Sequence, residues 1–168
     1  WGTTCAVRHS ACRSFQIFRV LISFLDLSIL KAMFHRLSNT ISDESADIQG
    51  FAMQILMTLN AIAAELDSQM LIDFPQHFWS SVACLSTIHE QEFIEVLSTM
   101  NKFISKIDLN ATDTINCLIS TFPPKWEGKF EGLQQIVTVG LRSSASWEPT
   151  LNFIDKLLSL SLIHISEP

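Results

Sequence analysis

The side chains that most often carry out chemistry are few in this sequence and lie far apart along it. The sequence contains five histidines and four cysteines, namely His9, His35, His77, His89, His164, Cys5, Cys12, Cys84 and Cys117. No histidine pair has the HExxH spacing of a zinc protease, and none lies at zinc-finger spacing from a cysteine. No CxxC pair occurs, so we expect reduced, mostly buried thiols, which favours the cytosol. We therefore predict no metal and no cofactor.

Two local groups of ionisable residues resemble reactive sites in composition, one around His89 and one around Cys84. His89 is followed by Glu90 and Glu92, which we interpret as a histidine at a helix start with solvated carboxylates. Cys84 has His77 and His89 nearby in sequence, but it stands between apolar neighbours, so we expect an inert buried thiol. A small soluble enzyme with a pocket among these side chains stays as an alternative.

Other catalytic patterns are missing from the sequence. It has no Gly-x-Ser-x-Gly nucleophile elbow and no glycine-rich phosphate loop. Asp43, Glu44 and Asp47 form an acidic corner without the spacing of a calcium loop, and helix capping explains them better. The sequence therefore offers no recognisable catalytic motif.

One polar loop, residues 123–134, carries two large aromatic side chains among alternating charges. Its two leading prolines must end the preceding helix, because proline lacks a backbone donor. Two interpretations stay open. Trp126 and Phe130 either dock on the flanking helices and hold them together, or one of them anchors a partner within a charged rim. The candidate residues are Lys125, Trp126, Glu127, Lys129 and Phe130.

Composition limits the class of protein. The chain has 168 residues, 48% of them hydrophobic and 17% charged, which is too apolar for disorder. Its net charge is −6 without a basic run, which argues against nucleic-acid binding. Residues 48–64 carry no charge but include Gln49, Gln54 and Asn60 and are too short for a transmembrane span, so we expect a buried helix. Because the sequence begins at Trp1, we expect a fragment.

Apolar residues recur at spacings of three and four along most of the chain, which predicts helices. No period-two alternation or hairpin-turn signal predicts a strand. About eight helices are expected, at roughly 6–25, 26–40, 48–66, 75–88, 93–107, 112–122, 133–141 and 146–158, with a short turn at 69–72.

These helices group into hairpins at 6–40, 46–88, 90–121 and 131–160. Each hairpin takes about thirty to forty residues, which is the size of a HEAT or armadillo repeat. The predicted fold is therefore all-α, with hairpins stacked as an α-solenoid, and an irregular helical bundle is the alternative. We expect Asp26, Thr112 and Ser146 as helix caps. Gly140 would allow close approach of another backbone, and the last helix would bury Leu151, Ile154, Leu157 and Leu158.

Several separated blocks of the sequence agree, in order, with one known family: residues 1–4, 8–9, 11–19, 36–41, 74–79, 83–85, 92–93, 123–134 and 140–144. With these blocks the chain resembles the fungal branch of the Furry family of cell morphogenesis proteins. The resemblance covers residues 1–158, and this segment is similar to part of the central region of that family. Residues 159–168 do not continue it and resemble a translated adapter or read-through tail.

The resemblance implies a large, non-enzymatic helical-repeat scaffold. Such proteins work with NDR-family kinases and Mob coactivators in polarised growth, actin organisation and cell separation. It also implies a cytoplasmic location at the cell cortex or at sites of polarised growth. It transfers no catalytic or binding residue to this chain. A helical adaptor in transport or at the cytoskeleton is the alternative with the same fold.

Overall fold

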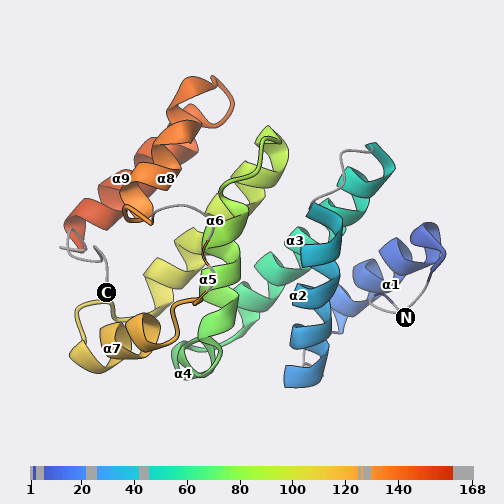
Figure 1. Cartoon of the computed structure of the whole chain (residues 1–168), viewed down its shortest axis with the longest axis horizontal. Helices are drawn as coiled ribbons and strands as arrows, with labels where there is room; N and C mark the ends of the chain where they lie inside the picture. Colours follow the sequence, from blue (N-terminus) through green and yellow to red (C-terminus); the bar gives the residue numbers. More distant parts are fainter. Residues whose placement is uncertain are drawn as a thin grey trace. The chain divides into compact units, whose positions relative to one another are not determined.

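The structure is a computed structural model that describes residues 2, 6–21, 26–41, 46–124, 126 and 130–160 (Figure 1). The side chains of residues 27, 38–41 and 46–49 lie outside that description. Over the described residues the chain forms nine α-helices and one 3-10 helix, with no strand. This confirms the predicted all-α class. The contacts divide the chain into two compact units, Trp1–Glu65 and Leu66–Pro168, and each is described by itself.

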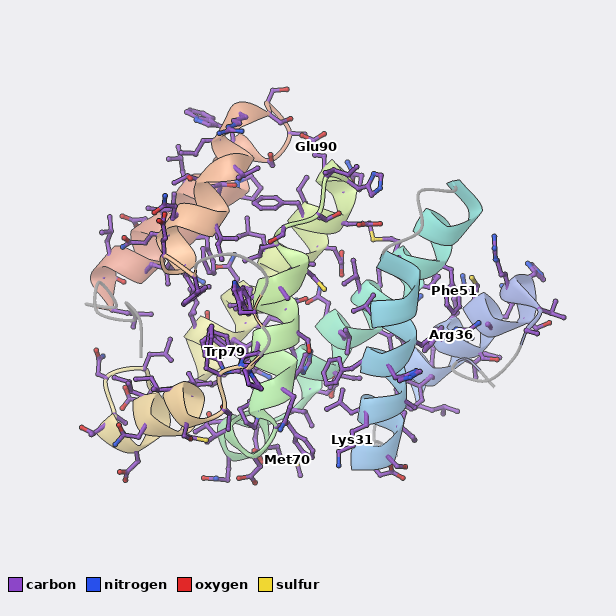
Figure 2. All side chains as sticks on the ribbon, viewed as in Figure 1. Lys31, Arg36, Phe51, Met70, Trp79 and Glu90 are labelled. Carbon is purple, nitrogen blue, oxygen red and sulfur yellow. The ribbon has the colours of Figure 1, made fainter. Side chains whose placement is uncertain are left out.

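Within its described residues, the first unit contains three helices, α1 (Arg8–Val20), α2 (Leu27–Ile41) and α3 (Ala46–Glu65). Both α1 and α2 pack on α3. Arg19 of α1 donates to the Gln54 carbonyl, to Thr58 Oγ1 at 3.0 Å and to Gln54 Oε1 at 2.9 Å. Arg36 of α2 lies 5.1 Å from the centre of the Phe51 ring of α3 (Figure 2). Cationic side chains therefore bind both outer helices to α3.

The predicted cap of the second helix is confirmed. The Asp26 carboxylate accepts hydrogen bonds from the backbone N–H of Ile29 at 2.9 Å and from Ser28 Oγ at 2.5 Å. These bonds lower the pKa of Asp26, the Ser28 bond most, because they favour the charged carboxylate. Asp43 and Glu44 of the acidic corner and residues 22–25 of the first predicted helix lie outside the described residues.

The second unit holds the remaining helices. These are α4 (Ser68–Asp73), α5 (Pro75–Cys84), α6 (Glu90–Lys106), α7 (Thr112–Ser120), α8 (Leu133–Val137), the 3-10 helix η2 (Thr138–Arg142) and α9 (Trp147–Ser159). α5 packs beside α6, and α8 packs beside α9 (Figure 1). α6 and η2 also contact α9, while α4 contacts α5 and α7. Packed helices of this kind are consistent with a helical-repeat fold.

Three features of the helix boundaries differ from the sequence prediction. The expected turn at 69–72 is a helix, α4, because the Asp67 side chain accepts from Met70 N at 2.8 Å and caps it. The expected hairpins at 6–40, 46–88 and 90–121 are wrong, since α1 and α2 each pack on α3 within the first unit, whereas α5 pairs with α6. The expected helix at 133–141 divides into α8 and η2.

One predicted cap is wrong, and another is right in its position but not in its hydrogen bond. The N-cap of α7 is Ala111 rather than Thr112, and no side chain caps it. Ser146 stands at the N-cap of α9, but its hydroxyl donates to the Gly140 carbonyl at 2.8 Å instead of accepting from the helix. At Gly140, the three atoms nearest to the position of a Cβ belong to the side chains of Thr150 and Phe93. A Cβ there would collide with Thr150 Oγ1 and would lie 2.5 Å from Phe93 Cε1.

The buried face of the last helix was predicted only in part. α9 buries Thr150, Phe153 and Leu157, whereas Leu151 and Leu158 are exposed. The apolar arc of this helix is wide enough to serve two surfaces, and the core of the second unit takes the side that carries Phe153. Residues 161–168 of the predicted tail lie outside the described residues.

Within the part of the chain that the structure describes, no helix combines the length and the apolar character needed to cross a membrane.

Candidate functional site

Four aromatic side chains of the second unit form one group around the loop that follows α7. We call Trp79, Phe122, Trp126 and Phe130 the aromatic cluster. The six ring pairs among them have centroid distances between 5.0 and 6.4 Å. Four of the six pairs are T-shaped, and the others are tilted by 32° and 48°. Edge-to-face packing at such distances is favourable because the ring edges are positive and the faces negative.

Trp79 is the member that a helix fixes in place. It lies on α5 (Figure 2). Only 3% of its surface is exposed. Its Nε1–H donates to the Leu118 carbonyl of α7 at 3.0 Å, so the buried indole has its hydrogen-bond partner. The hydrogen bond fixes the separation of α5 and α7 at the point where the loop begins.

The end of α7 places Phe122 beside that indole. α7 stops at Ser120, and the Thr121 hydroxyl donates to the Cys117 carbonyl at 2.7 Å. Pro123 and Pro124 follow, and neither can continue a helix. Phe122 then lies 5.0 Å from Trp79 between ring centres.

The loop returns to a helix at Gly132, whose φ of 102° is a left-handed value that favours glycine. Just before it, Phe130 is buried with 6% of its surface exposed, whereas Trp126 and Phe122 are half-buried. The cluster therefore has two buried rings and two that reach the surface of the second unit.

A second row of rings continues the cluster into the core between α5 and α6. Phe78 lies 5.1 Å from Trp79, and Phe103 of α6 lies 5.6 Å from Phe78. His77, fully buried on α5, makes an edge contact with Phe103 at 5.0 Å. The loop rings are thus part of a continuous aromatic contact path that reaches α6.

The structure brings together two of the five predicted loop residues, Trp126 and Phe130, at 5.3 Å between ring centres. Lys125, Glu127 and Lys129 lie outside the described residues, so the charged rim stays a prediction. Sequence reasoning missed Trp79 and Phe122 as members of the site. Both belong to helical apolar patterns, which hides their contact with the loop. An available signal was Trp79 itself, because a buried indole needs a nearby acceptor.

Cys84, the thiol considered for catalysis, lies in surroundings that do not favour a reactive thiolate. Cys84 is buried, and burial together with the Glu92 carboxylate raises the pKa of its thiol to about 12. It is therefore a neutral thiol at physiological pH and a poor nucleophile. Burial also raises the pKa of Cys12. The described cysteines Cys12, Cys84 and Cys117 are free thiols.

The carboxylates near His89 were predicted only in part. His89 does stand at the N-cap of α6. Glu92, however, is buried rather than solvated, and it accepts a hydrogen bond from Thr87 Oγ1 at 2.6 Å. Glu90 accepts from Ser143 Oγ, which links the start of α6 to the segment before α9. Among the described residues, no group of three or more His, Cys, Asp or Glu side chains is arranged to hold a metal ion.

Comparison with protein families gives a match that covers the second unit's helices from α5 onward. Residues 75–167, more than half of the chain, match a family model described as Cell morphogenesis C-terminal. All four residues of the aromatic cluster lie within that match.

Two curated relatives match nearly the whole chain. Cell morphogenesis protein PAG1 of Saccharomyces cerevisiae is 69% identical over 157 residues, which is 94% of this chain and 7% of that protein. Cell polarity protein mor2 of Schizosaccharomyces pombe is 38% identical over 153 residues, which is 91% of this chain and 7% of that protein. The chain thus spans about 7% of the length of these relatives. No solved structure matches significantly.

Proposed function

The chain belongs to the Furry family of cell morphogenesis proteins, and on that premise we propose that it is a non-enzymatic scaffold segment of a protein that supports cell polarity and polarised growth. The observation that carries the proposal is the 69% identity with a cell morphogenesis protein over 94% of this chain. Identity at that level along nearly the whole segment supports a shared role within the longer protein.

The partners and the location are part of the same proposal. We infer that the full-length protein acts with an NDR-family kinase and its Mob coactivator, at the cell cortex or at sites of polarised growth. Family resemblance supports this inference. The inert setting of Cys84 and the structural contacts of Glu92 support a role without catalysis.

For the loop, we propose a structural role with a partner-facing edge. Trp126 contacts three rings of the second unit, so it supports the packing of α5, α7 and the loop. Its half-buried indole also leaves part of a large amphipathic ring accessible. Together with Lys125, Glu127 and Lys129, that edge would form the surface a protein partner meets.

A segment exchange in yeast tests the function. The matching 157-residue stretch of the Saccharomyces cerevisiae relative would be replaced by this chain, and a second strain would lack the stretch. We expect the exchanged protein to support polarised growth, to concentrate at growing sites, and to co-purify with the NDR-family kinase and Mob. We expect the deletion to lose these properties.

Two results would argue against the proposal. An exchanged protein that is present at normal levels but fails to restore polarised growth would separate this chain from the role of its relative. Unchanged kinase recovery after deletion would leave the segment with a spacer role. A Trp126→Phe variant of the exchanged protein, which keeps an aromatic ring in the cluster, separates lost packing from lost partner contact.

A further inference from the structure

One side of α9 that the core of the second unit does not use carries a row of apolar residues along the helix. Trp147, Leu151 and Leu158 are 53%, 40% and 52% exposed, and Ile154 between them is half-buried. Their spacings of four, three and four place them on one side of the helix. We call these four residues the α9 stripe. The core of the second unit uses a different set of α9 side chains, centred on Phe153, so the stripe is additional to that core.

A row of this kind needs a covering partner. Single exposed apolar residues are ordinary, but a continuous row at helical spacing is typical of a helix that packs on two neighbours. The stripe presents a ridge of side chains three and four residues apart, which fits the groove of a second helix.

The edge of the stripe adds information about charge. Glu148 and Asp155 are both exposed. Glu148 comes one residue after Trp147, and Asp155 comes four residues after Leu151. They therefore line the side of the stripe that points away from the buried face of α9. The nearby cation, Lys156, instead donates to Ser105 Oγ of α6 at 3.1 Å. The free edge is acidic, so a covering helix that carries Lys or Arg there would complement it.

We propose that the α9 stripe is the docking face for an amphipathic α-helix of the same polypeptide, supplied by the part of the protein outside residues 1–168. The length of the relatives supports this occupant, because the chain spans about 7% of them and the rest of such a polypeptide is tethered to the same molecule. Helices in repeat folds bury their faces mainly against neighbouring helices of the same chain. The proposal concerns packing within one protein and does not depend on the kinase partnership.

Thiol labelling of the full-length protein tests it. Leu151→Cys places a thiol in the stripe, and Asn152→Cys is a matched control because Asn152 is exposed and lies off the stripe. Each native variant would be treated with a maleimide, and the α9 peptide would be quantified by mass spectrometry. We expect the stripe thiol to react at least about tenfold more slowly than the control thiol, because reagent reaches a covered site only through local opening. Equal rates at the two positions would overturn the proposal.

Two further measurements identify the occupant. Protection that persists after dilution to a monomer, as judged by mass photometry, supports a helix of the same polypeptide. Protection that is lost on dilution, or that requires an added protein, would overturn that assignment in favour of a second copy or a separate partner. Glu148→Lys with Asp155→Lys should speed labelling of the stripe thiol by about 2–10-fold, because it sets like charges against a basic helix. No change would overturn the basic character of the occupant.

Discussion

Replacing Trp126 by alanine tests whether the loop supports the packing of the second unit. Its indole has three ring partners at 5.3, 5.4 and 6.4 Å. A fully buried tryptophan costs about 3–5 kcal/mol on truncation to alanine, and aromatic pairs add about 0.5–1.5 kcal/mol each to area burial. Because Trp126 is half-buried, we expect Trp126→Ala to lower the free energy of unfolding by about 2–4 kcal/mol. Urea unfolding followed by circular dichroism measures this loss.

A matched tryptophan provides the control. Trp147→Ala removes the same atoms from a side chain that is 53% exposed, so it should change the stability of this chain by no more than about 0.5 kcal/mol. Hydrogen exchange of the α5 and α7 amides should show where the Trp126→Ala loss arises. If Trp126→Ala lowers the free energy of unfolding by well under about 1 kcal/mol, as the control should, the ring contacts do not stabilise the unit. That result would refute our reasoning about the loop.

Three further predictions concern the helices. Gly140→Ala should destabilise the chain by about 1–3 kcal/mol, because the added Cβ has no room. Gly50→Ala should instead stabilise helix α3 by about 0.5–1 kcal/mol, because its Cβ meets nothing within 4 Å. Urea unfolding of the two variants measures both effects. Arg19→Ala should lower the free energy of unfolding of the first unit by about 1–3 kcal/mol, because its hydrogen bonds to α3 are lost. Arg13→Ala, on the exposed side of α1, should lower it by under about 0.5 kcal/mol in the same assay. Because the pKa of Asp26 is lowered in the folded chain, its cap stabilises α2 fully above the unfolded pKa of about 3.9. That stabilisation is lost as the pH falls through the lower folded pKa. Hydrogen-exchange protection in the first turn of α2 should therefore fall in that pH window in the parent chain and not in Asp26→Asn.

Much of the fold could be predicted because most helices bury a stripe whose spacing is visible in the sequence. α6 shows this clearly, since Phe93, Val96, Leu97, Met100 and Phe103 are all buried. The misassigned pairing of α3 and α5 has a physical reason. Periodicity defines the inner face of a helix but does not say which helix covers it. α9 shows the same limit, because its apolar arc serves the core on one side and leaves the α9 stripe exposed on the other.

The candidate site was predictable at the loop and not beyond it. Trp126 and Phe130 stand out because large aromatic side chains in a polar loop must be covered. Their cover comes from Trp79, which precedes Trp126 by more than forty residues, and from Phe122 at the end of α7. A contact over that separation depends on how α5 and α7 pack, which local sequence patterns do not encode. The buried position of Glu92 was hidden for the same reason.

The geometry of the aromatic cluster has a consequence for how this protein tolerates change. Each of the four rings touches the other three, so the positions form a closed set rather than a chain of independent contacts. Once one ring is lost, a second loss removes fewer remaining contacts, and the combined cost is smaller than the sum of the separate costs. Substitutions at these four positions should therefore be epistatic. A lineage that loses one ring would drift more freely at the other three.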